Sequence, residues 1–377
     1  MFIYLQTIFV YLTITFVSVI LSKKYIATNN YGYIVAAVLF YSIVFGLRYG
    51  VGGDYFGYLN AFNLLSEKGQ IPIDREPGFM LLMRFCAFFH SSAFFFFLIA
   101  FLQLYIILLG FKNWPQLYPY LFFVFMFIGA WLQFGNGLRQ ILALSIWVLS
   151  LKYAAESRPL KHYLLLLLAI CFHNSAIILL PFYIIFRWRI DWFRNLKLEF
   201  LILAVSLVIM NSSFVEDLFN RLDVLVGVLG YSHYANYESE GGDLLDREVS
   251  IGIGFFITLF VNIIIIANSN KLKSFYNSNF FNVLYNLFYV GIISNYIFLH
   301  SQLFGRLVVY FYSFSFIMIA CVLYYFRISH QKLLYRLSMS LVLFTFIALL
   351  YRASTNWALF VFSWQNDYFY LHNGHNI

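Results

Sequence analysis

The chain has 377 residues, of which 62% are hydrophobic and only 11% are charged, and its formal net charge is +8. A soluble domain usually carries about 25% charged residues, so this composition excludes a soluble protein and indicates an integral membrane protein. The basic residues stand mostly in short segments between apolar runs, where they orient membrane helices, so we expect no nucleic acid as a partner.

Apolar segments recur along the whole chain and predict an all-α, polytopic integral membrane protein. Five of them come close to the roughly 20 residues that span a bilayer. These five are residues 2–22, 93–111, 249–268, 281–299 and 304–326. Together with shorter segments they predict about 12 transmembrane helices, within a range of roughly 10 to 14, in a single transmembrane domain over residues 1–377. Residues 48–77 and 212–248 are expected to be its long external loops.

The lysines and arginines between these segments predict the orientation of the helices. The pair Lys23–Lys24 after the first segment indicates a cytoplasmic loop, which places residues 48–77 outside. Residues 79–90 are too short to span comfortably and are expected to form an interfacial or re-entrant helix. Residues 160–186 are interrupted by "HNS" and are expected to form two short helices that meet on the outer side near His173. A rival threading, in which both segments cross once, leaves fewer basic residues in the cytoplasm.

The favoured threading brings several ionisable residues to the outer boundary of the membrane. An ionisable residue at this position is costly, and it is a functional candidate by default. The candidates are Arg48, Asp54, Glu76, Arg139, His173 and Arg306. Each also has a structural interpretation: snorkelling for Arg48, an ion pair for Arg306, a backbone hydrogen bond for His173, and an ordinary helix start for Glu76.

Arg139 lies just inside the start of a helix, in "GNGLRQILALSIW". The helix dipole disfavours a cation there, so we expect an anionic partner, and we favour a ligand over Asp54 or Glu76. Arginines at helix starts around an external pocket suit an oxygen-rich anion, such as a diphosphate attached to a membrane lipid. The sequence has no metal-binding pattern, and Cys86, Cys171 and Cys321 lie in apolar stretches, so we expect no metal and no cofactor.

Four segments are similar to those of a known family. They are "GLRYGVGGDYFGY", "EPGFMLLMRF", "GLRQILALSIWVLSLKY" and "FHNSAIILLPFYII". In order and spacing, from about residue 40 to 190, they resemble the EpsG-like branch of the Wzy polysaccharide (O-antigen) polymerases. The later part of the chain matches mainly in hydropathy and in "GRLVVYF".

The resemblance implies a GT-C-like fold and a metal-independent membrane glycosyltransferase. Such an enzyme joins undecaprenyl-diphosphate-linked oligosaccharide repeat units into O-antigen, capsule or exopolysaccharide. It works on the periplasmic or outer face of the bacterial cytoplasmic membrane and releases undecaprenyl diphosphate. The resemblance also implies a chain-length regulator and a flippase of the same pathway as partners.

Roles for the candidate residues follow from this chemistry. Arg139 and Arg306 are expected to bind the diphosphate, with Arg48 as a third candidate. His173 is the expected base for the acceptor hydroxyl, with Asp54 and Glu76 as rivals. The side chains expected to contact sugar are Asn136, Asn174, Tyr55, Tyr231 and Tyr234, the last two in the loop 212–248, which is the expected lid. Gly50, Gly52 and Gly53 would let the backbone approach a ligand.

Other functions stay open from the sequence. An O-antigen ligase or a related lipid-diphosphate glycosyltransferase would use the same kind of site. A flippase or transporter would need polar groups along a path through the midplane, whereas the middles of most predicted helices are apolar. A membrane acyltransferase would need more than a lone His173.

Overall fold

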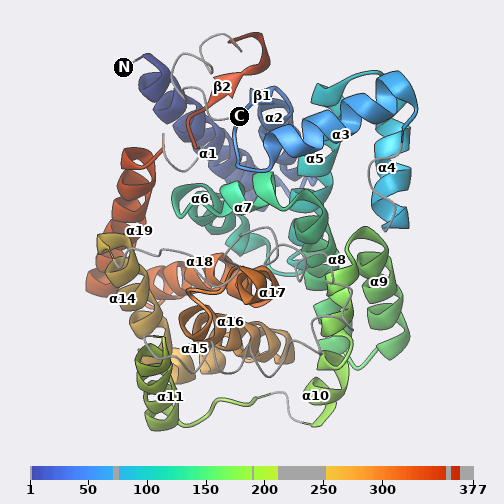
Figure 1. Cartoon of the computed structure of the whole chain (residues 1–377). Coiled ribbons are helices and arrows are strands. Elements are labelled where there is room, and N and C mark those ends of the chain that lie inside the picture. Colours follow the sequence, from blue (N-terminus) through green and yellow to red (C-terminus); the bar gives the residue numbers. More distant parts are fainter. Residues whose placement is uncertain (1, 71–75, 189–190, 211–251, 354–357, 366–377) are drawn as a thin grey trace. The chain divides into compact units, whose positions relative to one another are not determined.

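The computed structural model describes residues 2–70, 76–188, 191–210, 252–353 and 358–365. Most of these residues are helical (Figure 1), and the two-residue strands β1 (Arg48–Tyr49) and β2 (Val361–Phe362) form a small antiparallel sheet. The prediction of an all-α protein is therefore confirmed. The loop 212–248, with Tyr231 and Tyr234, lies outside the described residues.

The chain divides into two compact units. Residues 1–184 and 326–377 form unit 1, and residues 185–325 form unit 2. The elements of unit 1 are α1 (Phe2–Thr28), α2 (Gly32–Gly46), β1, α3 (Tyr55–Lys68), α4 (Pro77–Ala87), α5 (Ser92–Gly110), η1 (Pro115–Leu117), α6 (Tyr118–Phe127), α7 (Ala130–Asn136), α8 (Leu138–Ala155), α9 (Pro159–Phe172), η2 (Asn174–Leu179), α19 (Lys332–Tyr351), β2 and η3 (Ser363–Gln365).

Unit 2 is also helical. Its elements are α11 (Leu196–Ile209), α14 (Ile253–Ala267), α15 (Ser269–Tyr276), α16 (Asn279–Ile297) and α17 (Gln302–Tyr312). Two helices run across the division between the units, namely α10 (Phe182–Trp188) and α18 (Phe314–Ile328).

Many of the described helices are long and apolar enough to cross a membrane. Six qualify by length and composition, and up to eight do so if each of two bent helix pairs is one span. Four further apolar helices are shorter, with 10–17 residues, and they include α4 and α9. A polytopic membrane protein is thereby confirmed, while the count of about 12 spans and the side that each loop faces stay predictions.

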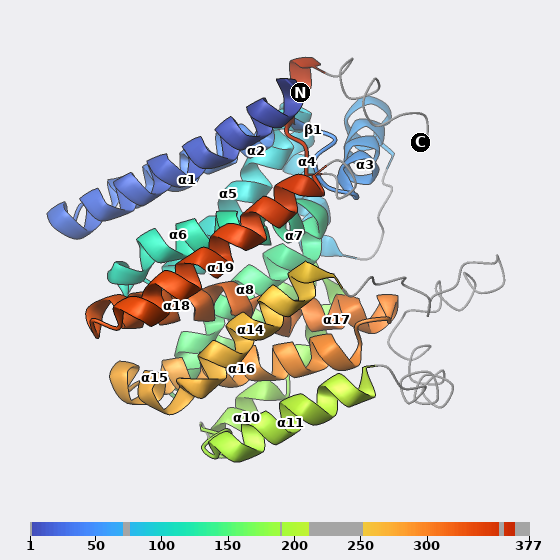
Figure 2. The same cartoon turned by 90° about the vertical axis from the view of Figure 1, so that its left-hand side faces the viewer.

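The core of unit 1 is built from packed pairs of helices, some consecutive in the chain and some separated by other elements. Helix α2 packs against α5, α5 against α8, and α8 against α9, while α1 lies along α2 and α6 (Figure 2). The approach of α2 to α5 requires a glycine, because a Cβ on Gly46 would lie 2.7 Å from Cβ of Phe97. The start of α8, which carries Arg139, is therefore held by a packed helical layer.

The segment that we expected as the first external loop contains a strand and a helix. Strand β1 pairs with β2, and α3 follows it after a turn in which Gly52 has a φ of 97°, a conformation that favours glycine. A Cβ on Gly52 would lie 2.4 Å from Oδ1 of Asn136, so the turn sits directly on the end of α7.

The break expected within residues 160–186 is present. Helix α9 ends at Phe172, His173 is extended with a φ of −156°, and a 3-10 helix begins at Asn174. This break confirms the prediction of two short helices within residues 160–186. The backbone at His173 therefore lies outside an α-helix. Helix α4 has only 11 residues, as its short apolar stretch predicted, and whether it is re-entrant stays a prediction.

Candidate functional site

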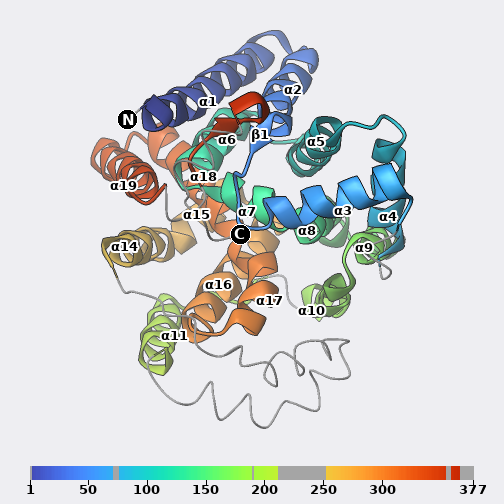
Figure 3. The same cartoon turned by 45° about the horizontal axis from the view of Figure 1, so that its top comes forward.

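Three of the predicted residues meet in unit 1. Glu76 precedes α4, Arg139 is the second residue of α8, and His173 follows the last residue of α9. In Figure 3, α3 and α4 lie beside each other, with α9 next to α4, as their packing contacts also show. The site thus forms where the ends of several helices converge.

Glu76 is the centre of this group. Its Oε2 atom lies 2.6 Å from Nη1 of Arg139, and its Oε1 atom lies 2.5 Å from Nδ1 of His173. The backbone N–H of Asn174 also donates to Oε1, at 3.3 Å. Only 4% of the Glu76 side chain is exposed. Both carboxylate oxygens are therefore occupied inside the protein, which suits a residue that orients its neighbours better than a base that approaches a substrate.

A close helix contact brings Glu76 and His173 together. Pro77 begins α4 in the first-turn position that proline favours, and Gly78 follows it. A Cβ on Gly78 would lie 3.0 Å from the carbonyl oxygen of Cys171, near the end of α9. The "EPG" sequence therefore combines the carboxylate, a helix start and the small residue that lets α4 approach α9.

Arg139 finds its anionic partner within the protein. We expected a ligand in this role in preference to Glu76, but the structure pairs the guanidinium with Glu76. The Arg139 side chain remains 30% exposed. Its Nε atom is buried, with no hydrogen-bond partner among the described residues. The Cζ atom of Arg139 lies 6.0 Å from the centre of the Phe79 ring, and the phenol of Tyr58 lies beside the side chain.

The environment of Glu76 keeps its carboxyl ionised. Burial raises its pKa, but the hydrogen bond and charge of His173 and the pairing with Arg139 outweigh burial and hold the pKa below its ordinary value. A carboxylate with a lowered pKa is negative at neutral pH. It therefore accepts hydrogen bonds from both of its partners.

His173 has one ring nitrogen bound and one directed elsewhere. Since ionised Glu76 can only accept, Nδ1 of His173 carries the proton in this contact. The Nε2 atom makes no hydrogen bond to any residue in the described part of the chain, and the side chain is 22% exposed. The neutral ring then presents Nε2 as a proton acceptor.

Arg48 lies inside unit 1, away from solvent. Its Nη1, Nη2 and Nε atoms donate to the carbonyl oxygens of Phe45, Gly135 and Val51 at 2.8, 3.3 and 3.3 Å. The guanidinium also lies 4.7 Å from the Phe96 ring centre. With 1% of its surface exposed, Arg48 ties the turn after α2 to the end of α7, which favours a structural role over diphosphate binding.

The remaining candidates occupy different settings. Tyr55 is buried and stacks on Phe96, with ring centres 4.7 Å apart. Asn136 has a buried Oδ1 atom without a hydrogen-bond partner among the described residues. Asp54 is exposed just before α3, and the Asn174 side chain is exposed beside His173. Asp54 and Asn174 thus stay sugar-contact or base candidates at the edge of the site.

Arg306 belongs to the other compact unit. It is exposed on α17, in unit 2, whereas Glu76, Arg139 and His173 belong to unit 1. Its predicted role at the diphosphate stays a prediction, as do the roles of Tyr231 and Tyr234.

Two residues near the guanidinium were missed by the sequence analysis. Tyr58 and Phe79 both contact Arg139. The sequence signal for Tyr58 is its position four residues after the candidate Asp54, which puts both on the same side of a helix. That signal exists only if residues 55–68 are predicted to be helical. Phe79 follows "EPG" and reads in sequence as one more apolar residue of α4.

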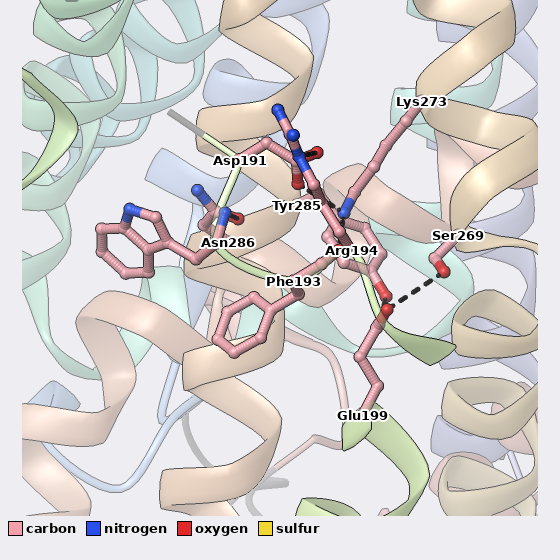
Figure 4. Close-up of polar contacts among 9 residues, drawn as sticks. Asp191, Phe193, Arg194, Glu199, Ser269, Lys273, Tyr285 and Asn286 are labelled. Carbon is pink, nitrogen blue, oxygen red and sulfur yellow. Dashed lines mark hydrogen bonds and ion pairs between the residues drawn. The ribbon is translucent and has the colours of Figure 1, made fainter. Parts of the chain in front are cut away.

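A second polar cluster lies in unit 2 (Figure 4). Lys273 donates to Asp191 at 2.8 Å, and Arg194 pairs with the same carboxylate at 2.9 Å. The buried Glu199 accepts from the hydroxyls of Tyr285 and Ser269. These contacts join α11, α15, α16 and the segment before α11. All of the partners are internal, which indicates a structural cluster.

Comparison with known proteins gives one match. The model of a family described as the EpsG family matches residues 31–366, which include all four segments of the proposed resemblance. No curated protein and no solved structure matches the chain.

Proposed function

The chain belongs to the EpsG family, and from that premise we propose that it is a membrane glycosyltransferase that polymerises lipid-diphosphate-linked oligosaccharide repeat units. Family membership supports a polysaccharide polymerase-like function at a membrane. The finer proposal names undecaprenyl diphosphate as the lipid carrier and the outer face of the bacterial cytoplasmic membrane as the place of reaction. A flippase and a chain-length regulator of the same pathway are the proposed partners.

The observation that carries this proposal is the carboxylate of Glu76 between His173 and Arg139. A carboxylate that accepts from one imidazole nitrogen fixes the tautomer and leaves the other nitrogen as a base. The same carboxylate holds a cation beside that base. Glycosyl transfer from a diphosphate needs both groups, one for the acceptor proton and one for the leaving group.

In the proposed step, Nε2 of His173 takes the proton of the acceptor hydroxyl. The hydroxyl oxygen forms a bond to the anomeric carbon of the donor while the bond between that carbon and the diphosphate oxygen breaks. The electron pair of the broken bond remains on the diphosphate, and the proton remains on His173 as an imidazolium. Glu76, which already accepts from Nδ1, stabilises this imidazolium.

The net charge of the three side chains becomes more positive during this step. Before transfer, Glu76 offsets the charge of Arg139, so the three side chains together are neutral when His173 is neutral. As His173 gains a proton, the group becomes positive while negative charge grows on the leaving diphosphate. Arg139 has five N–H donors, and Glu76 occupies one of them, so donors remain for phosphate oxygens.

Arg306 stays in the proposal as a second cation for the diphosphate, and Asp54 and Asn174 as contacts to sugar hydroxyls. Arg48 is assigned to support of the turn after α2. Glu76 is assigned to positioning instead of proton removal. An O-antigen ligase-like enzyme would use the same three side chains, so the acceptor decides between the two functions.

The test is polymerisation by the purified protein with lipid-linked repeat units extracted from a strain that lacks it. We expect chains of several repeats with and without a chelator, and single repeats only with His173→Ala or Arg139→Ala. Normal chain growth by either variant, present in the membrane at wild-type amount, would refute the proposal. Transfer of a unit to an acceptor that is not linked to undecaprenyl diphosphate would indicate the ligase.

A further inference from the structure

Arg139 is held by Glu76 through a single contact. A carboxylate often binds a guanidinium through both oxygens, which fixes its orientation. Here Nη1 of Arg139 contacts Oε2, while Oε1 is occupied by His173 and by the N–H of Asn174. Glu76 alone therefore fixes the position of one nitrogen and leaves the plane of the guanidinium to be set by another group.

Tyr58, in the second turn of α3, is that other group. Its phenol lies beside both the side chain and the backbone of Arg139. The Tyr58 ring packs on Phe79, with ring centres 6.0 Å apart, and the Arg139 guanidinium lies 6.0 Å from the same ring. The phenol, the guanidinium and the Phe79 ring thus form one contact group beside Glu76.

The contact with the backbone of Arg139 has a clear physical cause. The first N–H groups of a helix have no partner within it, and Arg139 is the second residue of α8. Gly137 precedes the helix and has no side chain that could cap it. The phenol oxygen of Tyr58 lies beside this backbone N–H and beside the guanidinium, and as an acceptor it suits both donors.

The phenol is well suited to this task because it stays neutral. Burial raises the pKa of Tyr58 above its ordinary value, although Arg139 lowers it in part. A neutral phenol accepts through its oxygen and places no second negative charge beside Arg139. The positive charge of Arg139 is therefore offset only once, by Glu76, and remains available to an anionic ligand when His173 is protonated.

We infer that Tyr58 is a positioning residue, whose hydroxyl orients the guanidinium of Arg139 toward the leaving diphosphate. This inference rests on the proposed function and adds α3 to the machinery of the site. It assigns no contact between Tyr58 and the substrate. Loss of the hydroxyl should therefore act only through Arg139.

The experiment is a double-mutant cycle of Tyr58→Phe and Arg139→Lys, with rates measured on lipid-linked repeat units in membranes of known protein content. Tyr58→Phe keeps the ring on Phe79 and removes the oxygen. A hydrogen bond to a charged group corresponds to a factor of about 10 to 100, so we expect kcat to fall by that factor. Inhibition by farnesyl diphosphate, a soluble prenyl diphosphate, should weaken by a similar factor.

In the Arg139→Lys background, the same removal of the hydroxyl should change kcat by less than about threefold, since the oriented group is already gone. Tyr153→Phe, near the other end of α8, is the matched control and should behave as wild type. An equal loss in both backgrounds, or wild-type kcat for Tyr58→Phe, would overturn the inference. Wild-type activity of Arg139→Lys would instead refute the proposed function, so the two failures are distinguishable.

A second pair of variants covers the case in which Tyr58→Phe does not accumulate in the membrane. Tyr58→His keeps a planar ring with an acceptor nitrogen, whereas Tyr58→Leu has no acceptor. We expect the histidine variant to be the faster of the two. Equal rates per amount of protein would count against a role for the acceptor.

Discussion

Replacing Glu76 by glutamine tests the centre of the site with almost no change of shape. The amide has one acceptor oxygen and one donor NH₂ group in place of two acceptor oxygens. It can accept from Arg139 or from His173, but the other partner then faces an N–H group. The substitution therefore removes at least one charge-assisted hydrogen bond and the negative charge that supports both partners.

The size of the effect follows from the burial of the three side chains. A hydrogen bond to a charged group contributes about 1.5 to 3 kcal/mol, and a fully buried cation left unpaired would cost more. Arg139 and His173 are 30% and 22% exposed, so water compensates part of the loss. We expect about 2 to 3 kcal/mol of lost stability and a melting temperature lower by a few degrees.

The rate should fall further than stability. Without the carboxylate, Nδ1 of His173 is no longer held as the donor, and the imidazolium formed in the reaction is no longer stabilised. General base catalysis contributes about 10² to 10⁴, so we expect the polymerisation rate to fall at least about a hundredfold. The assay is polymer length and rate with purified protein, beside a melting curve in the same detergent.

Glu156→Gln is the matched control. Glu156 pairs with Arg158 at 3.3 Å, but both side chains are well exposed, at 43% and 57%. An exposed pair contributes about 0 to 1 kcal/mol, so neither the rate nor the melting temperature should change measurably. If Glu76→Gln kept more than about a third of the wild-type rate, the assignment of Glu76 as the support of His173 and Arg139 would be wrong.

Further variants test the surroundings of the site. Gly78→Ala should force α4 away from α9 by a few tenths of an ångström and lower the polymerisation rate about tenfold. The control Gly57→Ala, whose Cβ meets nothing within 4 Å, should keep the wild-type rate. Equal rates for the two variants would show that activity does not require the close contact. Arg48→Lys should lower the yield and melting temperature of the protein, because one ammonium cannot serve the three carbonyls that the guanidinium binds; an unchanged melting curve would contradict its structural role. Glu199→Ala should lower the free energy of unfolding by about 3 to 4 kcal/mol, because it leaves two buried hydroxyls without their acceptor. A decrease under about 1 kcal/mol, measured by denaturation, would show that the cluster contributes little to stability. The difference in free energy of unfolding between wild type and Glu76→Gln should persist from about pH 7 down to about pH 4.3, because the lowered pKa keeps Glu76 ionised in the folded protein. Below that pH the difference should vanish as the pH falls through the pKa of Glu76 in the folded state. A difference already lost near about pH 6 would contradict the lowered pKa.

The helices of unit 1 could largely be predicted, because apolar runs of sufficient length dominate the sequence. The break before Asn174 could also be predicted, since "HNS" interrupts an apolar run. Helix α3 could not, because "YFGYLNAFNLLSEK" contains polar residues and a glycine and was taken as part of a loop. Only its packing against α4 and α5 shows which face is apolar.

The members of the site could be named from sequence, but their pairing could not. Glu76, Arg139 and His173 were each singled out as ionisable residues at helix ends, and nothing in their spacing says which of them touch. Arg48 shows the opposite problem. Among the described residues its guanidinium donates to backbone carbonyls and packs on aromatic rings, and no sequence pattern reveals such partners, so Arg48 could not be told apart from a ligand-binding cation.

The pairing of β1 with β2 has a consequence for how the protein is made. Residues 47–49 are bound by residues 361–363, and Thr7 and Tyr11 of α1 bind Phe360 and Ala358. A ribosome synthesises β1 early and β2 much later. The segments that contain Glu76, Arg139 and His173 are therefore synthesised before the strand that pairs with β1 exists. A product of premature termination before residue 358 would contain Glu76, Arg139 and His173 and still lack the strand that pairs with β1.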